Sequence, residues 1–505
     1  MSKQQKDYEH MHQLSRKASI LSGISHLLDW DHETYMPAGS AGIRAKQFEV
    51  MAGLIHEMKT SKNYVKALSK LIDIKTGKII ATNLSSAQQA ALREWRYDYL
   101  KDTALPKKFV EEFACIASQA VMAWRDAKKN DAFLCFAPFL EKLIAMSRKK
   151  ADLLGYKDDP YDALLDQFEK GTSTKEIASL FSDLRRSIGP LLKKITKAKQ
   201  VDDRFLFGKF PHEKQLKFAK KLLNDMGYDF SKGRLDLSSH PFSSSSHPTD
   251  SRITTRIHPT SLMSNLWVVL HEGGHSLYEM GLPVEHYGSP LGESISLGIH
   301  ESQSRWWETR IGQSQAFWSY YFPLLKKEFK SLERISLPKF YQAINKVEPS
   351  FIRVEADEVT YSLHVILRFE LERELINGKL KVREIPEAWN SKMQEFLGIT
   401  PKNNSEGCLQ DIHWSMGAFG YFPTYTLGNL YGAHFFEAFA KQHPDWEKRV
   451  AAGELAFIKQ WLQQQIYQYG RRYRSKELLK KINPTPFSAQ SFTKYLTHKY
   501  KEIYG

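Results

Sequence analysis

The stretch that most constrains the fold is residues 262–281, which end in the sequence VVLHEGGHSLYEMG. Apolar side chains recur in it three or four positions apart, at Leu266, Val269, Leu270, Leu277 and Met280. This spacing puts them on one face of an α-helix. Gly281 is of a residue type that often follows the last turn of a helix. We therefore predict a single helix over residues 262–280.

His271 and His275 share one face of this predicted helix, one turn apart. Two imidazoles at this spacing can bind one divalent ion, and Glu272 on an adjacent face can reach the water that the ion activates. This HExxH pattern is typical of zinc hydrolases. The alternative is a pair of core histidines hydrogen-bonded to a packed carboxylate.

Gly273 and Gly274 lie between the two histidines, where each costs the helix about 1 kcal/mol relative to alanine. A helix with a purely structural role has no reason to accept both. We expect the missing side chains to let a neighbouring helix or a substrate backbone come close to the metal. On this hypothesis a side chain at either position would obstruct the metal site.

A catalytic zinc ion needs a third protein ligand and an open position. The next helical stretch offers three carboxylates, at Glu293, Glu301 and Glu308. Small residues on the face that carries Glu301 could press against the glycines of the 262–280 helix. The spacing favours Glu301 modestly over Glu293, and for each of the three a surface charge or an ion pair is the alternative.

The rest of the chain also has mostly helical periodicity. Amphipathic helices are predicted at 107–128, 173–197, 357–375 and 453–469. Strand signals are few, and the clearest is residues 251–258, which are rich in β-branched side chains. The preceding serine-rich residues 240–248 are predicted to be a mobile loop. With no fixed-period repeat and no low-complexity linker, the simplest architecture is one helical catalytic body.

Composition narrows the classes of protein that need to be considered. The 505 residues carry a net charge of +15, but the basic residues are dispersed, so we expect no nucleic-acid partner. The N-terminus lacks the apolar segment of a signal peptide and no apolar run is long enough to span a membrane, so we expect a cytoplasmic location and no membrane partner. The three cysteines have no CxxC spacing, and we expect buried free thiols.

Several motifs, in one order along nearly the whole chain, identify it as similar to the Taq-type zinc metallocarboxypeptidases. HEGGH at 271–275 matches the family's HExxH, and HESQ at 300–303 matches its third-ligand segment. The other matches are DSRIT at 250–254, IRVEAD at 352–357, GCLQDIHW at 407–414, LDWDHETYMPAG at 28–39, PYDALLDQFEKG at 160–171 and GYFPTYTLGNLYGA at 420–433.

The resemblance implies roles for individual residues. His271, His275 and Glu301 correspond to the metal ligands, and Glu272 to the general base. The implied fold is mainly α, a two-lobed helical body with a deep substrate groove and a small β-sheet beside the HExxH helix, similar to angiotensin-converting enzyme and the thimet-type oligopeptidases. The resemblance also implies a homodimer and one zinc ion per chain, for which cobalt can substitute.

Further residues are candidates for holding the substrate and the developing negative charge. Tyr421, Tyr425 and His413 are the candidate oxyanion donors, because they cluster in the sequence downstream of the metal motifs. A carboxypeptidase needs a cation for the substrate carboxylate, and a guanidinium suits it best. Arg353 is the first candidate. Arg252 is the second, with bracing of Asp250 or of the strand as its alternative role.

Further predictions concern substrate pairing, the surroundings of the site and the division of the chain. Residues 251–258 could pair with an extended substrate through the main chain. Gln410 and Asp411 are expected to orient a metal ligand or His413. The chain is expected to form one catalytic unit over residues 1–505, with an N-terminal helical part at about 1–230, a zinc-site core at about 231–440 and C-terminal helices at about 441–505.

The function predicted is that of a zinc-dependent carboxypeptidase acting on peptide substrates with broad specificity. The alternatives are an endo-acting oligopeptidase with the same zinc site and a catalytically silent scaffold protein. The intact Glu272 argues against a silent scaffold. An arginine placed to hold a carboxylate separates the other two.

Overall fold

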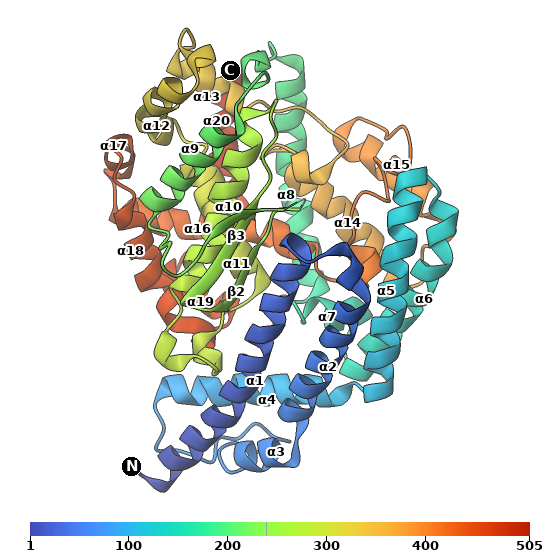
Figure 1. The fold of residues 1–505 in the computed structure, drawn as a ribbon. Coiled ribbons are helices and arrows are strands. Elements are labelled where there is room, and N and C mark those ends of the chain that lie inside the picture. Colours follow the sequence, from blue (N-terminus) through green and yellow to red (C-terminus); the bar gives the residue numbers. More distant parts are fainter. Residues whose placement is uncertain (239) are drawn as a thin grey trace.

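A computed structural model describes residues 1–238 and 240–505 of the chain. It shows a helical protein with one small sheet (Figure 1). The first ten helices are α1 (Lys3–Thr34), α2 (Ala41–Thr60), α3 (Lys62–Ser69), α4 (Ser86–Ala104), α5 (Lys107–Asn130), α6 (Phe133–Leu154), α7 (Pro160–Leu165), α8 (Thr174–Lys197), α9 (His212–Met226) and α10 (Leu262–Met280). They are followed by α11 (Leu297–Arg305), α12 (Gln315–Glu328), α13 (Leu337–Ile344), α14 (Tyr361–Ile376), α15 (Ile385–Leu397), α16 (Pro423–Gln442), α17 (Trp446–Ala451), α18 (Ala456–Gln465), α19 (Ser475–Ile482) and α20 (Gln490–Tyr504).

The helices predicted from periodicity are present, but their ends differ by up to four residues, and the predicted 453–469 helix is only α18, Ala456–Gln465. The 262–280 prediction coincides with α10, and the 173–197 helix begins one residue later, after a capping box made by Ser173 and Glu176. The 357–375 helix begins only at Tyr361, because the side chain of Asp357 accepts hydrogen bonds from the backbone of Val359 and Thr360 and so forms a turn.

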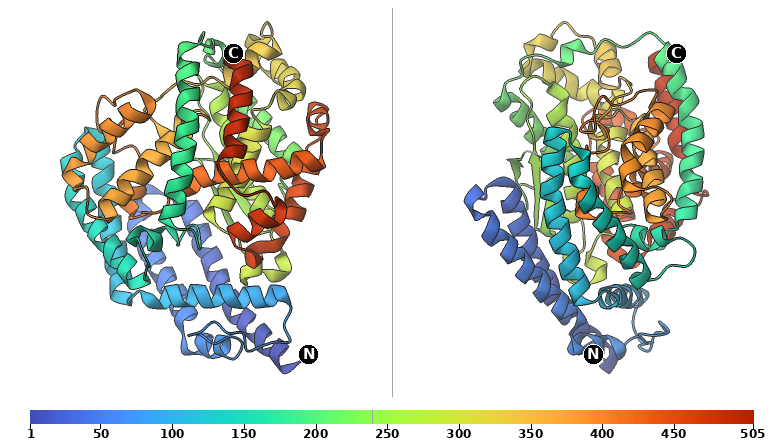
Figure 2. Two further views of the ribbon diagram at one scale, coloured as in Figure 1. Left: turned by 180° about the vertical axis from the view of Figure 1, so that it is seen from behind. Right: turned by 90° about the vertical axis from the view of Figure 1, so that its right-hand side faces the viewer.

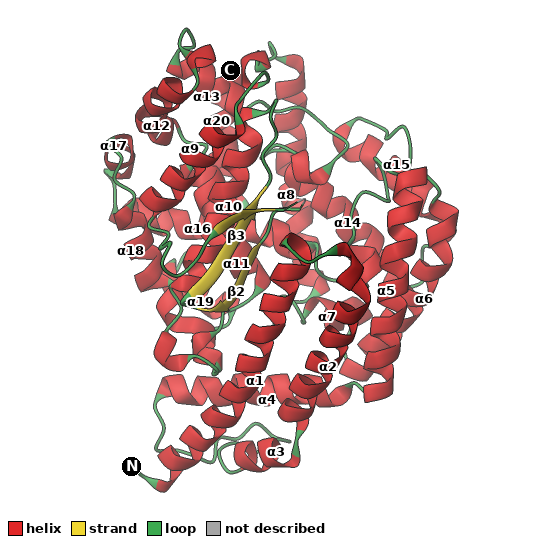
Figure 3. Ribbon diagram, in the orientation of Figure 1, coloured by secondary structure: helices red, strands yellow, loops and turns green. Residues whose placement is uncertain are grey.

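The sheet contains β1 (Leu235–Leu237), β2 (Ser243–His247) and β3 (Asp250–Thr255) in the order β1-β3-β2 (Figure 3). β1 runs parallel to β3, and β2 runs antiparallel to β3. The prediction of a mobile loop at 240–248 was therefore wrong for residues 243–247. Pairing with β3 outweighs the weak strand preference of serine, and the Ser245 hydroxyl also bonds the Ser251 hydroxyl at 2.5 Å.

Two hydrophobic cores lie in the described part of the chain. The larger one includes α10 and extends from Ala120 to Tyr500, whereas the smaller one is built mainly from α1, α3 and α4. In Figure 1, α4 runs across the lower part of the molecule near the lower ends of α5 and α6, with α3 and the N-terminus below it. The left view of Figure 2 shows the same arrangement from behind. The mainly α fold is as predicted, and the division of the chain into three parts stays a prediction.

The three cysteine thiols differ in their exposure to solvent. Cys408 is a buried free thiol as expected, but Cys115 and Cys135 are exposed, so the expectation was wrong for these two. Each lies on the solvent side of an amphipathic helix, α5 or α6. No helix in the described residues is long and apolar enough to cross a membrane.

Candidate metal centre and active site

α10 and α11 pack against each other and bring three candidate ligands together. The Nε2 atoms of His271 and His275 lie 3.6 and 3.4 Å from Oε2 of Glu301. One ligand atom from each residue lies within 4.8 Å of the others, a spacing that one metal ion could bridge. The structure therefore places together the three residues that the sequence patterns proposed.

The donor set fits a divalent ion of the zinc type. Two imidazole nitrogens and one carboxylate are the ligand types of a catalytic zinc site with an open fourth position. The side chain of Glu301 is only 7% exposed, and its Oε1 is buried with no hydrogen-bond partner. A buried carboxylate oxygen without a partner is costly unless a cation is bound there.

The second ring nitrogens of both histidines are held by neighbouring side chains. Nδ1 of His271 lies 2.7 Å from Oε2 of Glu308, and Nδ1 of His275 lies 2.5 Å from Nδ1 of His300. His300 in turn lies 2.8 Å from Oε1 of Glu279. Such contacts fix the ring orientation of metal-binding histidines and leave Nε2 directed at the ion.

Sequence reasoning missed the supporting roles of Glu279 and His300 and considered Glu308 only as a ligand. A helical projection could have found Glu279, which lies one turn beyond His275, and Glu308, which lies two turns beyond Glu301. No sequence signal joins His300 to His275, because their contact depends on how α10 and α11 cross. Glu293, the other candidate ligand, instead pairs with Arg471 at 2.7 Å.

Glu272 lies on α10 between the two histidines. Burial and the nearby Glu301 carboxylate raise its pKa, whereas His271 and the hydroxyl of Ser243 on β2 lower it, and the net shift is upward. A carboxylate with a raised pKa is suited to accept a proton near neutral pH. Both β2 and β3 pack against α10 beside this site.

The two glycines of α10 bear out one part of the prediction, the approach of a neighbouring helix, and contradict the other, obstruction of the metal site. A Cβ on Gly274 would come within 2.6 Å of the Gln303 carbonyl oxygen and 2.7 Å of the Ser304 Cα, both in α11. A Cβ on Gly273 would meet Leu223 and Met226 of α9 instead. The hypothesis of direct obstruction was therefore wrong. Gly274 does allow a neighbouring helix to approach, and that helix carries Glu301.

His413, Tyr421 and Tyr425 form one cluster. Nε2 of His413 lies 3.0 Å from the Tyr425 hydroxyl, and the two tyrosine rings are 5.3 Å apart. The cluster lies near the metal centre, since Tyr425 is three residues before Gly428 on α16 and Gly428 packs against the Glu301 side chain. Burial as the main cause, and to a smaller extent the Glu301 carboxylate, raise the pKa of both tyrosines. Burial together with Arg353 and Arg368 lowers the pKa of His413 to about 3. The imidazole is therefore neutral at physiological pH.

Arg353 is buried and already paired. Its Nε and Nη2 donate to Oδ1 of Asp411 at 3.1 and 2.9 Å, and its Nη1 donates to the Tyr361 hydroxyl. Asp411 also binds Arg368 at 2.6 Å, so two guanidinium groups share one carboxylate and leave one positive charge in excess. Burial alone would raise the pKa of Asp411, but the two arginines hold it well below its usual range.

Gln410 and Asp411 were predicted to orient a metal ligand or His413, and that prediction was wrong, because their side chains bond Arg353, Arg368 and backbone carbonyls instead. Gln410 accepts a hydrogen bond from the backbone of Arg353 at 2.9 Å, and Asp411 holds its guanidinium. The spacing of these residues in GCLQDIHW gave no information about the partner, because Arg353 is more than fifty positions away in the chain. The two residues support the candidate carboxylate-binding arginine instead.

The family model for carboxypeptidase Taq (M32) metallopeptidases matches residues 10–500. The chain belongs to the M32 carboxypeptidase family. It is 39% identical to thermostable carboxypeptidase 1 of Thermus thermophilus, over 99% of both chains, and 35% identical to carboxypeptidase 1 of Bacillus subtilis, over 96% and 97%. A solved structure of the M32 carboxypeptidase from Deinococcus radiodurans superimposes with a TM-score of 0.95 at 36% identity, covering 99% of this chain and all of the other.

The protein is thus a metallocarboxypeptidase, a peptide hydrolase that depends on a metal ion. In this M32 carboxypeptidase Arg252, the second candidate for binding the substrate carboxylate, donates two hydrogen bonds of 2.7 and 3.0 Å to Asp250. Its guanidinium also lies over the ring of Trp30. Its bracing role, the alternative considered from the sequence, is therefore the arrangement observed. β3 is the central strand with both edges paired, so the prediction that residues 251–258 pair with an extended substrate was wrong for residues 251–255.

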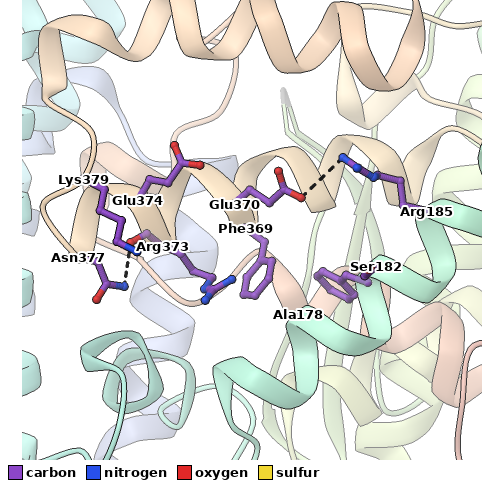
Figure 4. A pocket seen from close by; sticks show the side chains of 10 residues that line it. Ala178, Ser182, Arg185, Phe369, Glu370, Arg373, Glu374, Asn377 and Lys379 are labelled. Atoms are coloured by element: carbon purple, nitrogen blue, oxygen red, sulfur yellow. Dashed lines mark hydrogen bonds and ion pairs between the residues drawn. The ribbon is translucent and has the colours of Figure 1, made fainter.

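A cavity of about 370 Å³ between α8 and α14 lies outside this centre (Figure 4). Phe181 and Phe369 contribute its apolar lining, with charged residues around them. Arg185 and Glu370 in its wall lie 3.9 Å apart, and each has a further ion-pair partner outside the cavity. Its residues are not among the candidate metal ligands, and we assign it no part in the chemistry.

Proposed function

We propose that this M32 carboxypeptidase uses one zinc ion, held by His271, His275 and Glu301, to release C-terminal residues from peptides with broad specificity. The observation that carries the proposal is the convergence of three ligand atoms within 4.8 Å, one of them from the buried carboxylate of Glu301, whose Oε1 has no hydrogen-bond partner. Zinc rather than another divalent ion is favoured by the two imidazole ligands. Cobalt is expected to substitute.

A zinc ion bound there would act as a Lewis acid, polarising the scissile carbonyl and lowering the pKa of water. Glu272 is the general base that takes a proton from the attacking water and delivers it to the leaving amine. Its raised pKa suits both halves of this transfer. Glu308 and the pair of His300 and Glu279 keep the two histidines oriented.

Tyr421, Tyr425 and His413 are the proposed donors to the oxyanion that develops on the scissile carbonyl. Three observations support them: their mutual contacts, the effect of the Glu301 carboxylate on both tyrosines, and the neutral state of His413. A preorganised neutral donor stabilises a developing negative charge without repelling the metal. The strand β2 is the proposed place for main-chain contacts with the peptide, since it is an edge strand of the sheet and packs against α10, which carries Glu272.

Arg353 is the proposed site for the terminal carboxylate of the substrate. The excess positive charge of Arg353 and Arg368 around Asp411 supports this role, because a second carboxylate would neutralise it. Arg353 is also close to the oxyanion cluster, with its guanidinium 4.6 Å from the Tyr425 ring centre. This closeness supports a carboxylate-binding role for Arg353 next to the proposed oxyanion donors.

The test is a cycle of two changes, C-terminal amidation of the peptide and Arg353→Ala. Each is expected to remove one charge-assisted contact of about 2–4 kcal/mol, which lowers kcat/KM roughly thirtyfold to several hundredfold. The Arg353→Ala variant should add little further loss on amidated peptides, because both changes remove the same contact. Mass spectrometry of the products gives the order of release.

The matched control is Arg252→Ala, which removes an arginine that is paired with Asp250. We expect it to leave the ratio of free-acid to amide activity unchanged. Additive losses for Arg353→Ala and amidation would assign the clamp to another cation. Internal cleavage of amidated peptides at full rate would favour the oligopeptidase. The homodimer and the cytoplasmic location stay predictions.

A further inference from the structure

The motif PYDALLDQFEKG at 160–171 has no part in the chemistry described so far. Residues near its end nevertheless contact the N-terminus of α11, the helix that carries Glu301. The backbone N–H of Leu297 donates to the carbonyl of Phe168 at 3.1 Å, and the N–H of Gly298 donates to Oε2 of Glu169 at 3.1 Å. Ser296 accepts from the N–H of Ile299 at 3.2 Å. The first three amides of α11 are therefore all satisfied, two of them by residues 168 and 169.

Glu169 is held in place from several sides. It is fully buried, and the hydroxyl of Ser475 on α19 donates to its Oε1. Ser475 also bonds Ser296, the N-cap of α11, at 3.0 Å. A buried carboxylate with this many fixed donors has a defined position. The backbone amides at a helix N-terminus have no acceptor within the helix, so they favour a negatively charged acceptor outside it.

The helix that Glu169 holds is short, so movement at its start reaches the metal ligand. α11 has nine residues, and Glu301 is three residues after Gly298, less than one turn along the helix. Glu301 is confined on its other side by Gly428 of α16, whose missing Cβ leaves room for the Glu301 side chain. Displacement of the first turn of α11 would therefore move the Glu301 carboxylate relative to the two histidines.

Gly298 gives independent evidence for the closeness of this contact. A Cβ at this position would collide with Oε2 of Glu169 and come within 2.9 Å of the Tyr431 ring. Gly298 lies in a helix with φ in the ordinary negative range, so no backbone strain requires a glycine there. The reason for the glycine is the approach of the Glu169 carboxylate.

We propose that Glu169 is a positioning residue for the metal centre: by binding the Gly298 amide it fixes α11 so that the Glu301 carboxylate faces His271 and His275. The inference rests on the proposed role of Glu301 as the third ligand. It predicts that a change at residue 169 or 298 weakens metal binding although neither residue contacts the ion.

The experiment measures the Kd of the full-length protein for Zn²⁺ by competition with a chelator, and the visible absorption of the Co²⁺ form. Glu169→Ala and Gly298→Ala should each raise the Kd for Zn²⁺ at least about tenfold, the lower end of the range for partners behind metal ligands. Both should also shift the Co²⁺ bands. Glu169→Gln keeps a carbonyl acceptor for the Gly298 amide and should stay within about threefold of the wild type.

The matched control is Glu372→Ala, which removes another fully buried carboxyl group. Glu372 accepts from Tyr161 at 2.6 Å, Trp414 at 2.9 Å and the Gly420 amide at 3.1 Å, so it supports the segment before Tyr421 rather than α11. It should leave the Kd for Zn²⁺ unchanged. Equal Kd values for Glu169→Ala, Gly298→Ala and the wild type would overturn the inference, as would an equal loss in Glu372→Ala.

Two further outcomes separate this inference from the proposed function. If Glu301→Gln leaves the Kd for Zn²⁺ unchanged, the ligand assignment itself fails. If Glu301→Gln raises the Kd and the changes at 169 and 298 do not, only the positioning role fails. Should Glu169→Ala not fold, Gly298→Ala and Glu169→Gln still decide: a raised Kd in the first and a retained Kd in the second support the role, and an unchanged Kd in Gly298→Ala overturns it.

Discussion

Gly274→Ala should weaken both the fold and the metal centre, although alanine is the better helix former. The added Cβ would lie 2.6 Å from the Gln303 carbonyl oxygen and 2.7 Å from the Ser304 Cα, roughly 1 Å closer than atoms pack at their optimal separation. Both atoms belong to the backbone of α11, so a side-chain rotation cannot relieve the contact. Overpacking of this kind costs about 1–3 kcal/mol, against about 1 kcal/mol gained in helix propensity.

The net expectation for Gly274→Ala is a loss of up to about 2 kcal/mol in the free energy of unfolding of the metal-free protein. The contact lies two residues from Glu301, so separation of α10 from α11 also moves the third ligand away from the histidines. Metal sites tolerate displacements of only about 0.5 Å, and we expect a weaker Kd for Zn²⁺ and a lower kcat. Urea unfolding with chelator present and Zn²⁺ competition measure the two effects.

Gly273→Ala is the matched control on the same helix. Its Cβ would meet Cδ2 of Leu223 at 2.9 Å and Cε of Met226 at 3.0 Å, which are the flexible ends of side chains in α9. These ends can move, so stability should change by less than about 1 kcal/mol and the Kd for Zn²⁺ should not change. A Gly274→Ala protein as stable and as tightly zinc-bound as Gly273→Ala would refute the reasoning.

The remaining predictions concern the metal and the buried carboxyl groups. A chelator should abolish activity and Zn²⁺ or Co²⁺ should restore it, and full activity in metal-free protein would contradict the metal's role. Glu301→Gln should lose the metal and Glu272→Gln should keep it but lose turnover, whereas Glu293→Gln should do neither; metal analysis alongside assays separates these outcomes. Glu308→Gln should weaken Zn²⁺ binding about 10- to 100-fold in the same competition assay, because it removes a charged partner of His271. Burial raises the pKa of Glu372 from 4.5 to about 7, so the native state binds more protons than the unfolded state between these values. The stability from this group is complete below about pH 4.5 and falls by roughly 3 kcal/mol as the pH rises through 7. Glu372→Gln should flatten this part of the curve of unfolding free energy against pH, and an unchanged slope would argue against the shift.

The sequence by itself determined the parts of this protein that depend on local spacing. The apolar stripe around Leu266 and the stop at Gly281 gave α10, and the i, i+4 spacing put His271 and His275 on one face. These features do not depend on contacts with other parts of the fold, because the geometry of one helix is enough to produce them. Motif order along the chain gave the family, and with it the mainly α fold and Glu301 as a ligand candidate.

Only the tertiary structure decided which distant groups meet. It showed that Gly274 faces the backbone of α11, that His300 supports His275, and that Asp411 holds Arg353. It also turned the serine run at 243–247 into a strand, because pairing with β3 supplies hydrogen bonds that local preference does not predict. Helix periodicity is repeated every few residues in the sequence, whereas contacts between elements depend on how those elements cross, and no single sequence records that angle.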